Sequence, residues 1–275
     1  MKFKYIIIGF NIIIIFFLLI VTLVPIFVLG MDSARRFFLS GWPVALILLA
    51  TLVGLNVFFL FNRRLFLLLE REDWPALVDY LERRVYDGKR YSRRLVRLLA
   101  NSYVIMSDSA GVLRLERKLA LAKPALVESN ALVFGAARIL GGNPVAAAAF
   151  FSARLEKGKA DEPQWVRWYY GFSLLLSRSF DKAEAEFRDL AAAGDDALVI
   201  GLSAWFLSDT LCKFSANQEE CRAAAEQGRR RVREKLKSAE DWQKEASKIE
   251  TEVHAALIKK YIDQSAAWLF QKGQV

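Results

Sequence analysis

Charged side chains are nearly absent from the first 62 of the 275 residues. The chain has 39 Lys and Arg and 30 Asp and Glu. The first 62 residues contain only Lys2, Lys4, Asp32, Arg35 and Arg36. Such a segment is too apolar for a water-soluble domain, whereas residues 63–275 are long enough for one or two compact cores. A hydrophobic content of 54% excludes disorder as the main state.

Histidine and cysteine are also scarce. His254 is the only histidine, and the sequence has no G-x-x-x-x-G-K-[ST], G-x-G-x-x-G, G-x-S-x-G or H-E-x-x-H motif. We therefore predict no enzymatic activity, no catalytic residue, no cofactor, no metal site and no small-molecule substrate. Cys212 and Cys221 lack metal or redox spacing. We expect two thiols if they face the cytoplasm, and a bridge between two helices in the opposite topology.

Two uncharged runs, residues 5–31 and 37–62, are each longer than the ~20 residues that cross a bilayer as a helix. They predict a transmembrane hairpin over residues 1–64, with spans at about 5–29 and 41–62 and some ten residues between them. A signal peptide is the alternative for the first run. The run exceeds the 7–15 apolar residues of such peptides, and residues 29–34 make a poor cleavage site, so we favour an uncleaved helix.

The positions of Lys and Arg predict how the hairpin is oriented. The side of the two termini carries Lys2, Lys4, Arg63, Arg64 and Arg71, and the connecting loop carries Arg35 and Arg36. This excess favours a multi-pass protein of the inner (cytoplasmic) membrane with both termini in the cytoplasm.

One asparagine interrupts each apolar run at the same predicted depth. Asn11 follows Lys4 by seven residues, and Asn56 precedes Arg63 by seven. Two interpretations fit equally well. A hydrogen bond between Asn11 and Asn56 would join the two spans, or each amide would reach towards the nearby interface.

Residues beyond 64 have the pattern of amphipathic helices separated by short breaks. Capping residues precede first-turn prolines at 73–75 and 142–144. Breaks are expected near 87–88, 107–109, 141–142, 157–158, 178–179 and 194–195. Sustained period-two alternation is absent, so the sequence predicts an all-α fold.

A spacing pattern recurs after 36 residues. A glycine is followed by alanine at +12 and phenylalanine at +16, in Gly135, Ala147 and Phe151 and again in Gly171, Ala183 and Phe187. This pattern resembles the tetratricopeptide repeat (TPR), a helix–turn–helix unit of about 34 residues. The resemblance implies a TPR-like α-solenoid over residues 65–215 that binds a protein partner. A non-repetitive helical bundle is the alternative.

The resemblance has departures. In a partial third copy that begins at Ala100, Glu116 occupies the phenylalanine position, and Arg138 occupies a position where the repeat has an aromatic residue. The order of two spans, a short loop and repeats is similar to that of inner-membrane TPR proteins associated with haem biosynthesis. This similarity is in architecture only and transfers no functional residue.

Residues 216–275 are expected to form a C-terminal cap of two long helices, 217–237 and 239–270. The apolar stripe of the second helix starts at Trp242 and ends at Tyr261. It would cover the open end of a solenoid, and a coiled-coil partner is the alternative. The apolar segment 268–270 would dock back onto the chain or bind a partner.

Seven basic residues gather shortly after the second span: Arg83, Arg84, Lys89, Arg90, Arg93, Arg94 and Arg97. One interpretation of this basic patch is contact with anionic lipid headgroups. The other is a solvated helix face or a site for an acidic partner. A second basic run, residues 229–237, points all round its helix, which favours a solvated helix over a nucleic-acid site.

The sequence therefore predicts an integral membrane scaffold or adaptor with a cytoplasmic TPR-like domain for protein–protein interaction. The alternative is a structural subunit of a multi-protein membrane complex for envelope assembly, secretion or motility. Five aromatic residues of the repeats would line the core, which we favour, or a binding groove: Trp165, Trp168, Tyr169, Tyr170 and Trp205.

Overall fold

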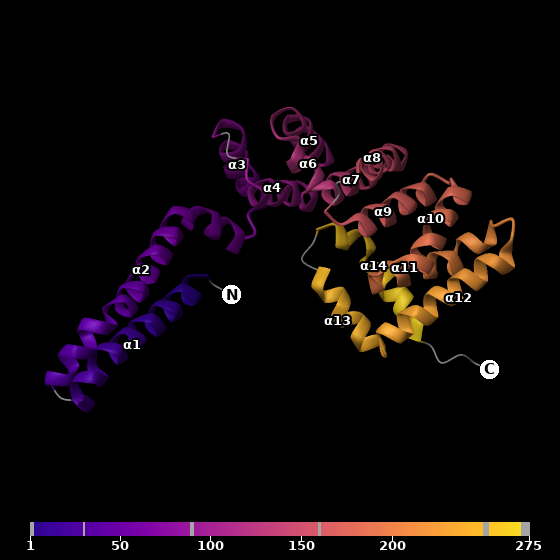
Figure 1. The fold of residues 1–275 in the computed structure, drawn as a ribbon. Coiled ribbons are helices and arrows are strands. Elements are labelled where there is room, and N and C mark those ends of the chain that lie inside the picture. Colours follow the sequence, from indigo (N-terminus) through magenta and orange to yellow (C-terminus); the bar gives the residue numbers. More distant parts are fainter. Residues whose placement is uncertain (1–2, 30, 89–90, 159–160, 250–252, 271–275) are drawn as a thin grey trace. The chain divides into compact units, whose positions relative to one another are not determined.

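The computed structural model describes residues 3–29, 31–88, 91–158, 161–249 and 253–270. Helices make up 87% of the chain, and these described ranges contain no strand. The all-α prediction is confirmed, with two long apolar helices followed by a helical, repeat-like region (Figure 1). The chain divides into two compact units, Met1–Tyr80 and Leu81–Val275.

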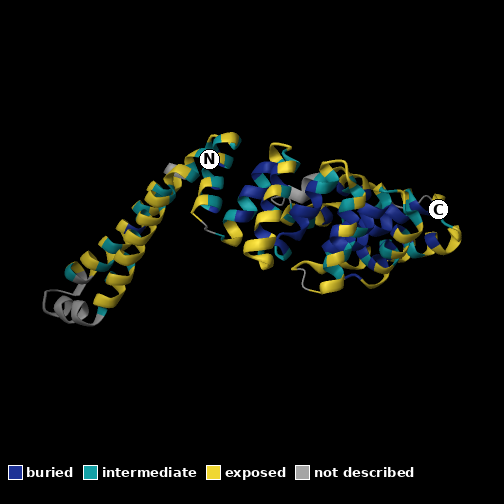
Figure 2. Ribbon diagram, turned by 90° about the horizontal axis from the view of Figure 1, so that it is seen from above, coloured by how far each residue is buried: buried dark blue, intermediate teal, exposed yellow. Residues whose placement is uncertain are grey.

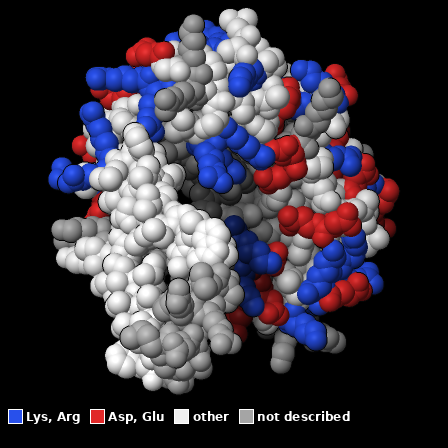
Figure 3. Space-filling view, turned by 60° about the vertical axis from the view of Figure 1, so that its left-hand side comes forward, with Lys and Arg blue, Asp and Glu red and all other residues white. Residues whose placement is uncertain are grey.

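The first unit contains the helical hairpin of α1 (Phe3–Leu29) and α2 (Met31–Glu70). Two stretches are long and apolar enough to cross a membrane, Tyr5–Val24 and Gly41–Glu70. Their apolar side chains are mostly exposed in the chain by itself, as the yellow of Figure 2 shows. Figure 3 shows one face of the molecule, on which the hairpin is mostly white and the repeat unit carries charged side chains of both signs.

The hairpin differs from its prediction at both ends of α2. The segment expected to be a ten-residue loop is helical from Met31 onward, because residues 31–40 contain neither Gly nor Pro to stop a helix. At its other end α2 continues to Glu70. The sequence-based boundary at residue 64 therefore lies inside this helix.

The helices that follow pack mainly as antiparallel pairs. Their bounds are α3 Trp74–Glu82, α4 Arg93–Ile105, α5 Ser109–Ala122, α6 Pro124–Glu128, α7 Ala131–Leu140, α8 Pro144–Lys157, α9 Pro163–Leu176, α10 Phe180–Ala193, α11 Ala197–Asp209 and α12 Gln218–Lys235. A π-helical turn, Arg83–Asp87, follows α3, and a 3-10 turn, Leu211–Lys213, follows α11. The helix ends confirm the predicted breaks. Asp73 and Asn143 accept hydrogen bonds from the N–H groups of Ala76 (3.2 Å) and Ala146 (3.0 Å) as predicted caps.

An aromatic core fills the middle of the second unit. Trp168 is fully buried, and its ring centroid lies 5.2 Å from that of Phe172 and 5.9 Å from those of Phe187 and Phe206. These rings come from α9, α10 and α11 and join the three helices into one body. Of the five aromatic residues named from the sequence, Trp165, Trp168, Tyr169 and Trp205 are buried and Tyr170 is half-buried, which confirms the core interpretation for four of them.

The prediction of one long helix over 239–270 is wrong. The chain forms two helices there, α13 (Ala239–Ile249) and α14 (Val253–Phe270), which pack against each other. The indole N–H of Trp242 donates to the carbonyl of Ile262 at 3.1 Å. In one continuous helix these residues would be about 30 Å apart. Packing against the rest of the unit therefore divides residues 239–270 into two helices, although their apolar spacing alone predicts a single helix.

Candidate interaction surface of the helical repeats

Four helix-to-helix turns share one backbone conformation. A residue with positive φ follows the first helix of each pair: Glu72 (53°), Ser107 (58°), Gly142 (74°) and Arg178 (62°). The next N–H in each turn donates to the carbonyl five positions earlier, at 2.8 to 3.1 Å, which is the Schellman arrangement. The intervals of 35, 35 and 36 residues show that the same helical hairpin recurs.

The sequence predicted breaks at 107–109, 141–142 and 178–179 but not the left-handed conformation that the turns share. Only one of the four left-handed positions is a glycine, the residue that normally marks this conformation. A weaker signal was present. The residue after each left-handed position is Asp73, Asp108, Asn143 or Ser179, and all four are residue types that favour helix N-caps. Their recurrence at the same intervals extends the pattern of turns back to the turn between α2 and α3.

The structure brings together the glycine and phenylalanine of each predicted repeat. A Cβ on Gly135 in α7 would lie 1.9 Å from the ring of Phe151 in α8. A Cβ on Gly171 in α9 would lie 3.0 Å from the ring of Phe187 in α10. Both phenylalanines are fully buried, as are Ala147 and Ala183. Each glycine therefore makes room for a ring from the second helix of its pair.

The two departures from the repeat pattern meet each other. Arg138 of α7 and Glu116 of α5 form an ion pair at 2.7 Å, with side chains only 17% and 13% exposed. Arg154 of α8 lies 3.8 Å from Glu116 and 3.6 Å from Glu128. Burial lowers the pKa of Arg154, and the two carboxylates oppose that effect. Charge pairing here replaces an aromatic contact between neighbouring repeats.

The ring of Phe150 is part of the same cluster. The guanidinium carbons of Arg138 and Arg154 lie 4.1 Å and 3.3 Å from its centroid, so cation–π attraction adds to the ion pairs. Removing one charge would leave its partner poorly hydrated. We therefore regard this cluster as a structural joint between α5, α7 and α8.

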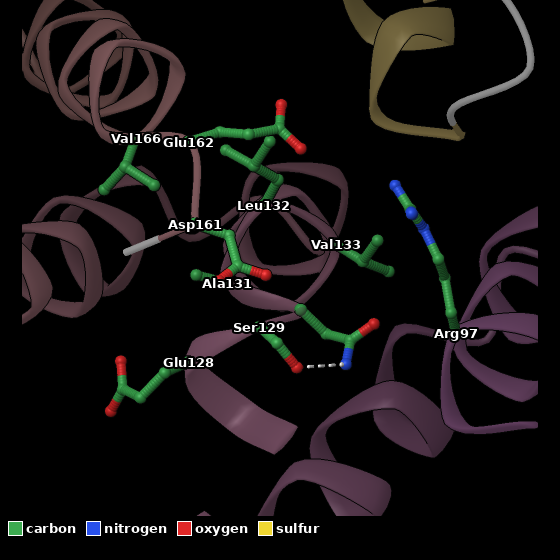
Figure 4. A pocket seen from close by; sticks show the side chains of 10 residues that line it. Arg97, Glu128, Ser129, Ala131, Leu132, Val133, Asp161, Glu162 and Val166 are labelled. Atoms are coloured by element: carbon green, nitrogen blue, oxygen red, sulfur yellow. Dashed lines mark hydrogen bonds between the residues drawn. The ribbon is translucent and has the colours of Figure 1, made fainter. Parts of the chain in front are cut away.

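A small polar pocket lies beside the junction of α6 and α7 (Figure 4). Its volume is about 20 Å³, and its lining includes Arg97, Asp161 and Glu162. Asn130 is 4% exposed and donates to the carbonyl of Leu126 at 2.8 Å, while its Oδ1 has no hydrogen-bond partner. A space of this size holds about one water molecule, so it offers no room for a substrate.

The predicted basic patch does not form one free surface. Arg83 and Arg84 lie on the π-helical turn, and Lys89 and Arg90 lie outside the described residues. On α4, Arg93 forms an ion pair with Asp161 at 2.5 Å, Arg97 lines the polar pocket and Arg94 is exposed. Two arginines of the patch therefore face acidic residues of the chain itself.

Arginines of the second basic run, residues 229–237, also donate hydrogen bonds to backbone carbonyls at the ends of other helices. Arg231 donates to the carbonyls of Ala191 (2.7 Å) and Gly194 (2.8 Å) at the end of α10. Arg233 donates to the carbonyl of Leu269 at 2.5 Å. Interpreting this run as a solvated helix was wrong for Arg231, which is half-buried, because helix C-termini have carbonyl groups without partners and a partial negative charge. Arg233 is exposed as predicted and also bonds a helix end.

In the hairpin, Asn11 and Asn56 exchange two hydrogen bonds. The Nδ2 of each donates to the Oδ1 of the other, at 3.1 Å and 3.0 Å. This geometry matches the staple interpretation. Beside it, an apolar cavity of about 270 Å³ opens between the two helices and is lined by residues that include Phe10, Phe58 and Phe66.

The cysteines form a disulfide, so the expectation of two thiols does not hold in this structure. Cys212 of the 3-10 turn and Cys221 of α12 have Cα atoms 5.5 Å apart and are 3% and 0% exposed. The turn after α11 brings them together, which their spacing in the sequence does not reveal. Disulfides of this kind are typical of oxidising compartments.

Together these features define a helical-repeat protein with an apolar N-terminal hairpin. A family model described as "Uncharacterised Treponema protein" matches residues 111–271, more than half of the chain, and the chain belongs to that family. It is also similar to an uncharacterized protein of Treponema pallidum (strain Nichols), 32% identical over 166 residues. That match covers 60% of this chain and 53% of the relative, so the chain spans about half the relative's length. No solved structure matches.

Proposed function

We propose that this protein is a membrane-anchored scaffold whose helical repeats bind a protein partner. The observation that carries this proposal is the recurrence of one hairpin turn at 35, 35 and 36 residues. Stacked helical hairpins are the architecture of α-solenoids, which present long surfaces for proteins rather than catalytic pockets. The TPR-like contact of Gly135 with Phe151 and of Gly171 with Phe187 supports the same class.

The apolar hairpin supports the membrane half of the proposal. The most apolar 18-residue windows within Tyr5–Val24 and Gly41–Glu70 have mean hydropathies of 3.1 and 2.6. Their exposed Ile, Leu and Phe side chains would be unfavourable in water and favourable in lipid. We expect the full chain to stay in the membrane fraction after washing with alkaline carbonate. Release of the full chain into the wash would refute the anchor.

Site-specific photo-crosslinking in native membranes tests the scaffold half. A crosslinker at Arg94 or at another exposed position of the repeats should join the same partner protein from several neighbouring positions. A crosslinker at an exposed hairpin position, such as Phe61, is the matched control. It should form crosslinks to lipid or to membrane-spanning helices of other proteins. If no repeat position gives a discrete product, the scaffold proposal is wrong.

A structural subunit of a multi-protein membrane complex is the second candidate. The apolar cavity between α1 and α2 favours it, because phenylalanine side chains there leave space for side chains of a helix from another protein. In that case detergent extraction should recover the chain with a polytopic partner, and Phe58→Ala should weaken that association. A repeat variant such as Arg94→Glu should leave it unchanged.

The excess of Lys and Arg on the side of the termini supports a cytoplasmic repeat unit at the inner membrane. The buried Cys212–Cys221 disulfide favours the opposite side. Thiol labelling distinguishes a cytoplasmic repeat unit from one on the opposite side of the membrane. In cells treated with acid to trap thiols, then denatured, a cytoplasmic unit should take up two maleimide groups without reductant. A unit in an oxidising compartment should take up none until reductant is added.

A further inference from the structure

The C-terminal helix α14 lies along the first helices of the repeat pairs. It contacts α4, α7 and α11, and Tyr261 of α14 reaches the aromatic residue Phe172 of α9. Figure 1 shows α14 passing beside α9 and α11. In α-solenoids one set of helices lines the surface that receives ligands. Here a helix of the chain itself already covers that set.

The part of α14 that meets the repeats is an apolar stripe. Ile258, Ile262, Ala266 and Leu269 are buried, at intervals of three and four residues. Lys259, Lys260, Asp263 and Gln264 are exposed on the other side. This pattern is that of an amphipathic helix bound in a groove, with anchors one turn apart.

Tyr261 is the aromatic anchor of the stripe. Its ring centroid lies 5.6 Å from that of Phe172, 5.9 Å from that of Trp205 and 5.1 Å from that of Phe206. These three rings pack on one another and on the core without α14. Phe172 and Phe206 lie 5.6 Å apart, and each also contacts Trp168. The receiving surface is therefore built by the repeats and not by the helix that occupies it.

The repeat unit also recognises the end of α14. Arg229 and Arg233 of α12 donate to the carbonyl of Leu269, at 3.4 Å and 2.5 Å. Two cations at a helix C-terminus oppose its partial negative charge. Gly201 of α11 lacks a side chain where Trp242 of α13 and Leu269 of α14 meet it, because a Cβ there would lie 2.5 Å from the Trp242 ring and 3.1 Å from the leucine Cδ1. An aromatic pocket, a small-residue gap and a cationic end together fit a helix of defined length and direction.

We propose that this surface, the α14 groove, is the site where the repeats bind a partner's amphipathic helix, and that α14 is its intramolecular occupant. The groove is formed by α4, α7, α9, α11 and α12, and α13 packs against the same helix, α14. The partner helix presents apolar residues at spacings of three and four, an aromatic anchor and a free C-terminal turn, and it displaces α14. This inference rests on the proposed scaffold function and names the recognition chemistry of that site. A tethered helix has an effective concentration on the order of millimolar, so it holds back weak competitors.

The test is a titration of the full chain in detergent with a fluorescent peptide of residues 253–270. The wild-type chain should bind the peptide weakly because α14 fills the groove. Tyr261→Ala in the chain loosens α14 and should increase peptide affinity about ten-fold. The same substitution in the peptide should abolish that gain. Lys260→Ala is the matched control on the exposed side of α14 and should change neither affinity.

A second variant covers the case in which Tyr261→Ala unfolds the unit. Arg233→Gln removes one bond to the end of α14 and no core ring, so it should raise peptide affinity by a smaller factor with an unchanged melting curve. If both variants stay folded and neither binds the peptide, α14 is a fixed part of the core and the proposal is wrong. A dimer that forms without peptide would assign the groove to a second copy and would also overturn it.

The photo-crosslinking experiment described above distinguishes failure of this inference from failure of the proposed scaffold function. Excess peptide should release the crosslinked partner from the Tyr261→Ala chain. If the partner is captured by the repeats and the peptide does not compete, the groove assignment fails and the scaffold stands. If the peptide binds and no repeat position captures a partner, the scaffold fails.

Discussion

Gly135→Ala tests whether close approach between paired helices determines the stability of the repeats. The new Cβ would lie 1.9 Å from Cζ of Phe151 and 2.5 Å from both of its Cε atoms. Carbon atoms in contact prefer 3.5–4.0 Å, so the ring must move by about 1.5 Å within a closely packed core. Gly171→Ala is the matched control, because its Cβ would lie 3.0 Å from Phe187 and needs a shift of only a few tenths of an ångström.

Two opposing terms set the expected magnitude. Alanine favours a helix over glycine by about 1 kcal/mol. Forcing an extra carbon into a full core costs about 1–3 kcal/mol, and expelling a buried phenylalanine costs about 3–5 kcal/mol. We expect Gly135→Ala to lower the free energy of unfolding by about 2–3 kcal/mol and Gly171→Ala to change it by less than about 1 kcal/mol.

Thermal unfolding of the full chain in detergent, followed by far-ultraviolet circular dichroism, measures both effects. At about 2–4 °C per kcal/mol for a unit of this size, the difference between the two variants should be at least about 2 °C. Phe151→Leu removes the ring atoms that clash, so the double variant should be more stable than the sum of the two changes predicts. Equal melting temperatures for the two alanine variants would refute the packing argument.

Four further results are expected. Arg178→Gly removes the side chain from a residue with positive φ and should raise the free energy of unfolding by about 0.5–1 kcal/mol. A decrease would show that the left-handed turn is unstrained. Glu116→Ala should cost about 3 kcal/mol in the same assay because it removes the carboxylate that pairs with Arg138 and leaves Arg154 with Glu128 alone. A loss below about 0.5 kcal/mol would contradict the structural role of the cluster. A double-mutant cycle of Asn11→Leu and Asn56→Leu should give a coupling of about 1 kcal/mol in detergent unfolding, and additive effects would contradict the staple. If the basic patch meets anionic lipid, Arg94→Glu should weaken binding of the full chain in detergent to anionic vesicles by about 1–2 kcal/mol relative to Arg94→Gln, with neutral vesicles as the control; equal binding by the two variants would exclude that role.

Local features of the sequence predicted most elements. Helix starts at Asp73 and Asn143 and the breaks between helices depend on residues close together in the chain, and the structure has them where expected. The spacing of Gly135, Ala147 and Phe151 predicted a helical hairpin, with the alanine expected against the gap at the glycine. The structure instead places the ring of Phe151 in that gap. The breaks at 107–109, 141–142 and 178–179 were predicted. The left-handed conformation at Glu72, Ser107 and Arg178 was not, because residues of these types rarely adopt a positive φ.

The sequence by itself determined two apolar runs, a helical fold and a period near 36, because each depends on composition or on spacing along one helix or hairpin. Only the tertiary structure decided what α14 covers, how Glu116 meets Arg138, which carbonyls Arg231 and Arg233 cap, and that Cys212 lies beside Cys221. These contacts join helices that follow separate turns, so they depend on the angles at which those helices pack. Packing of the whole unit therefore selects partners that the local pattern leaves open.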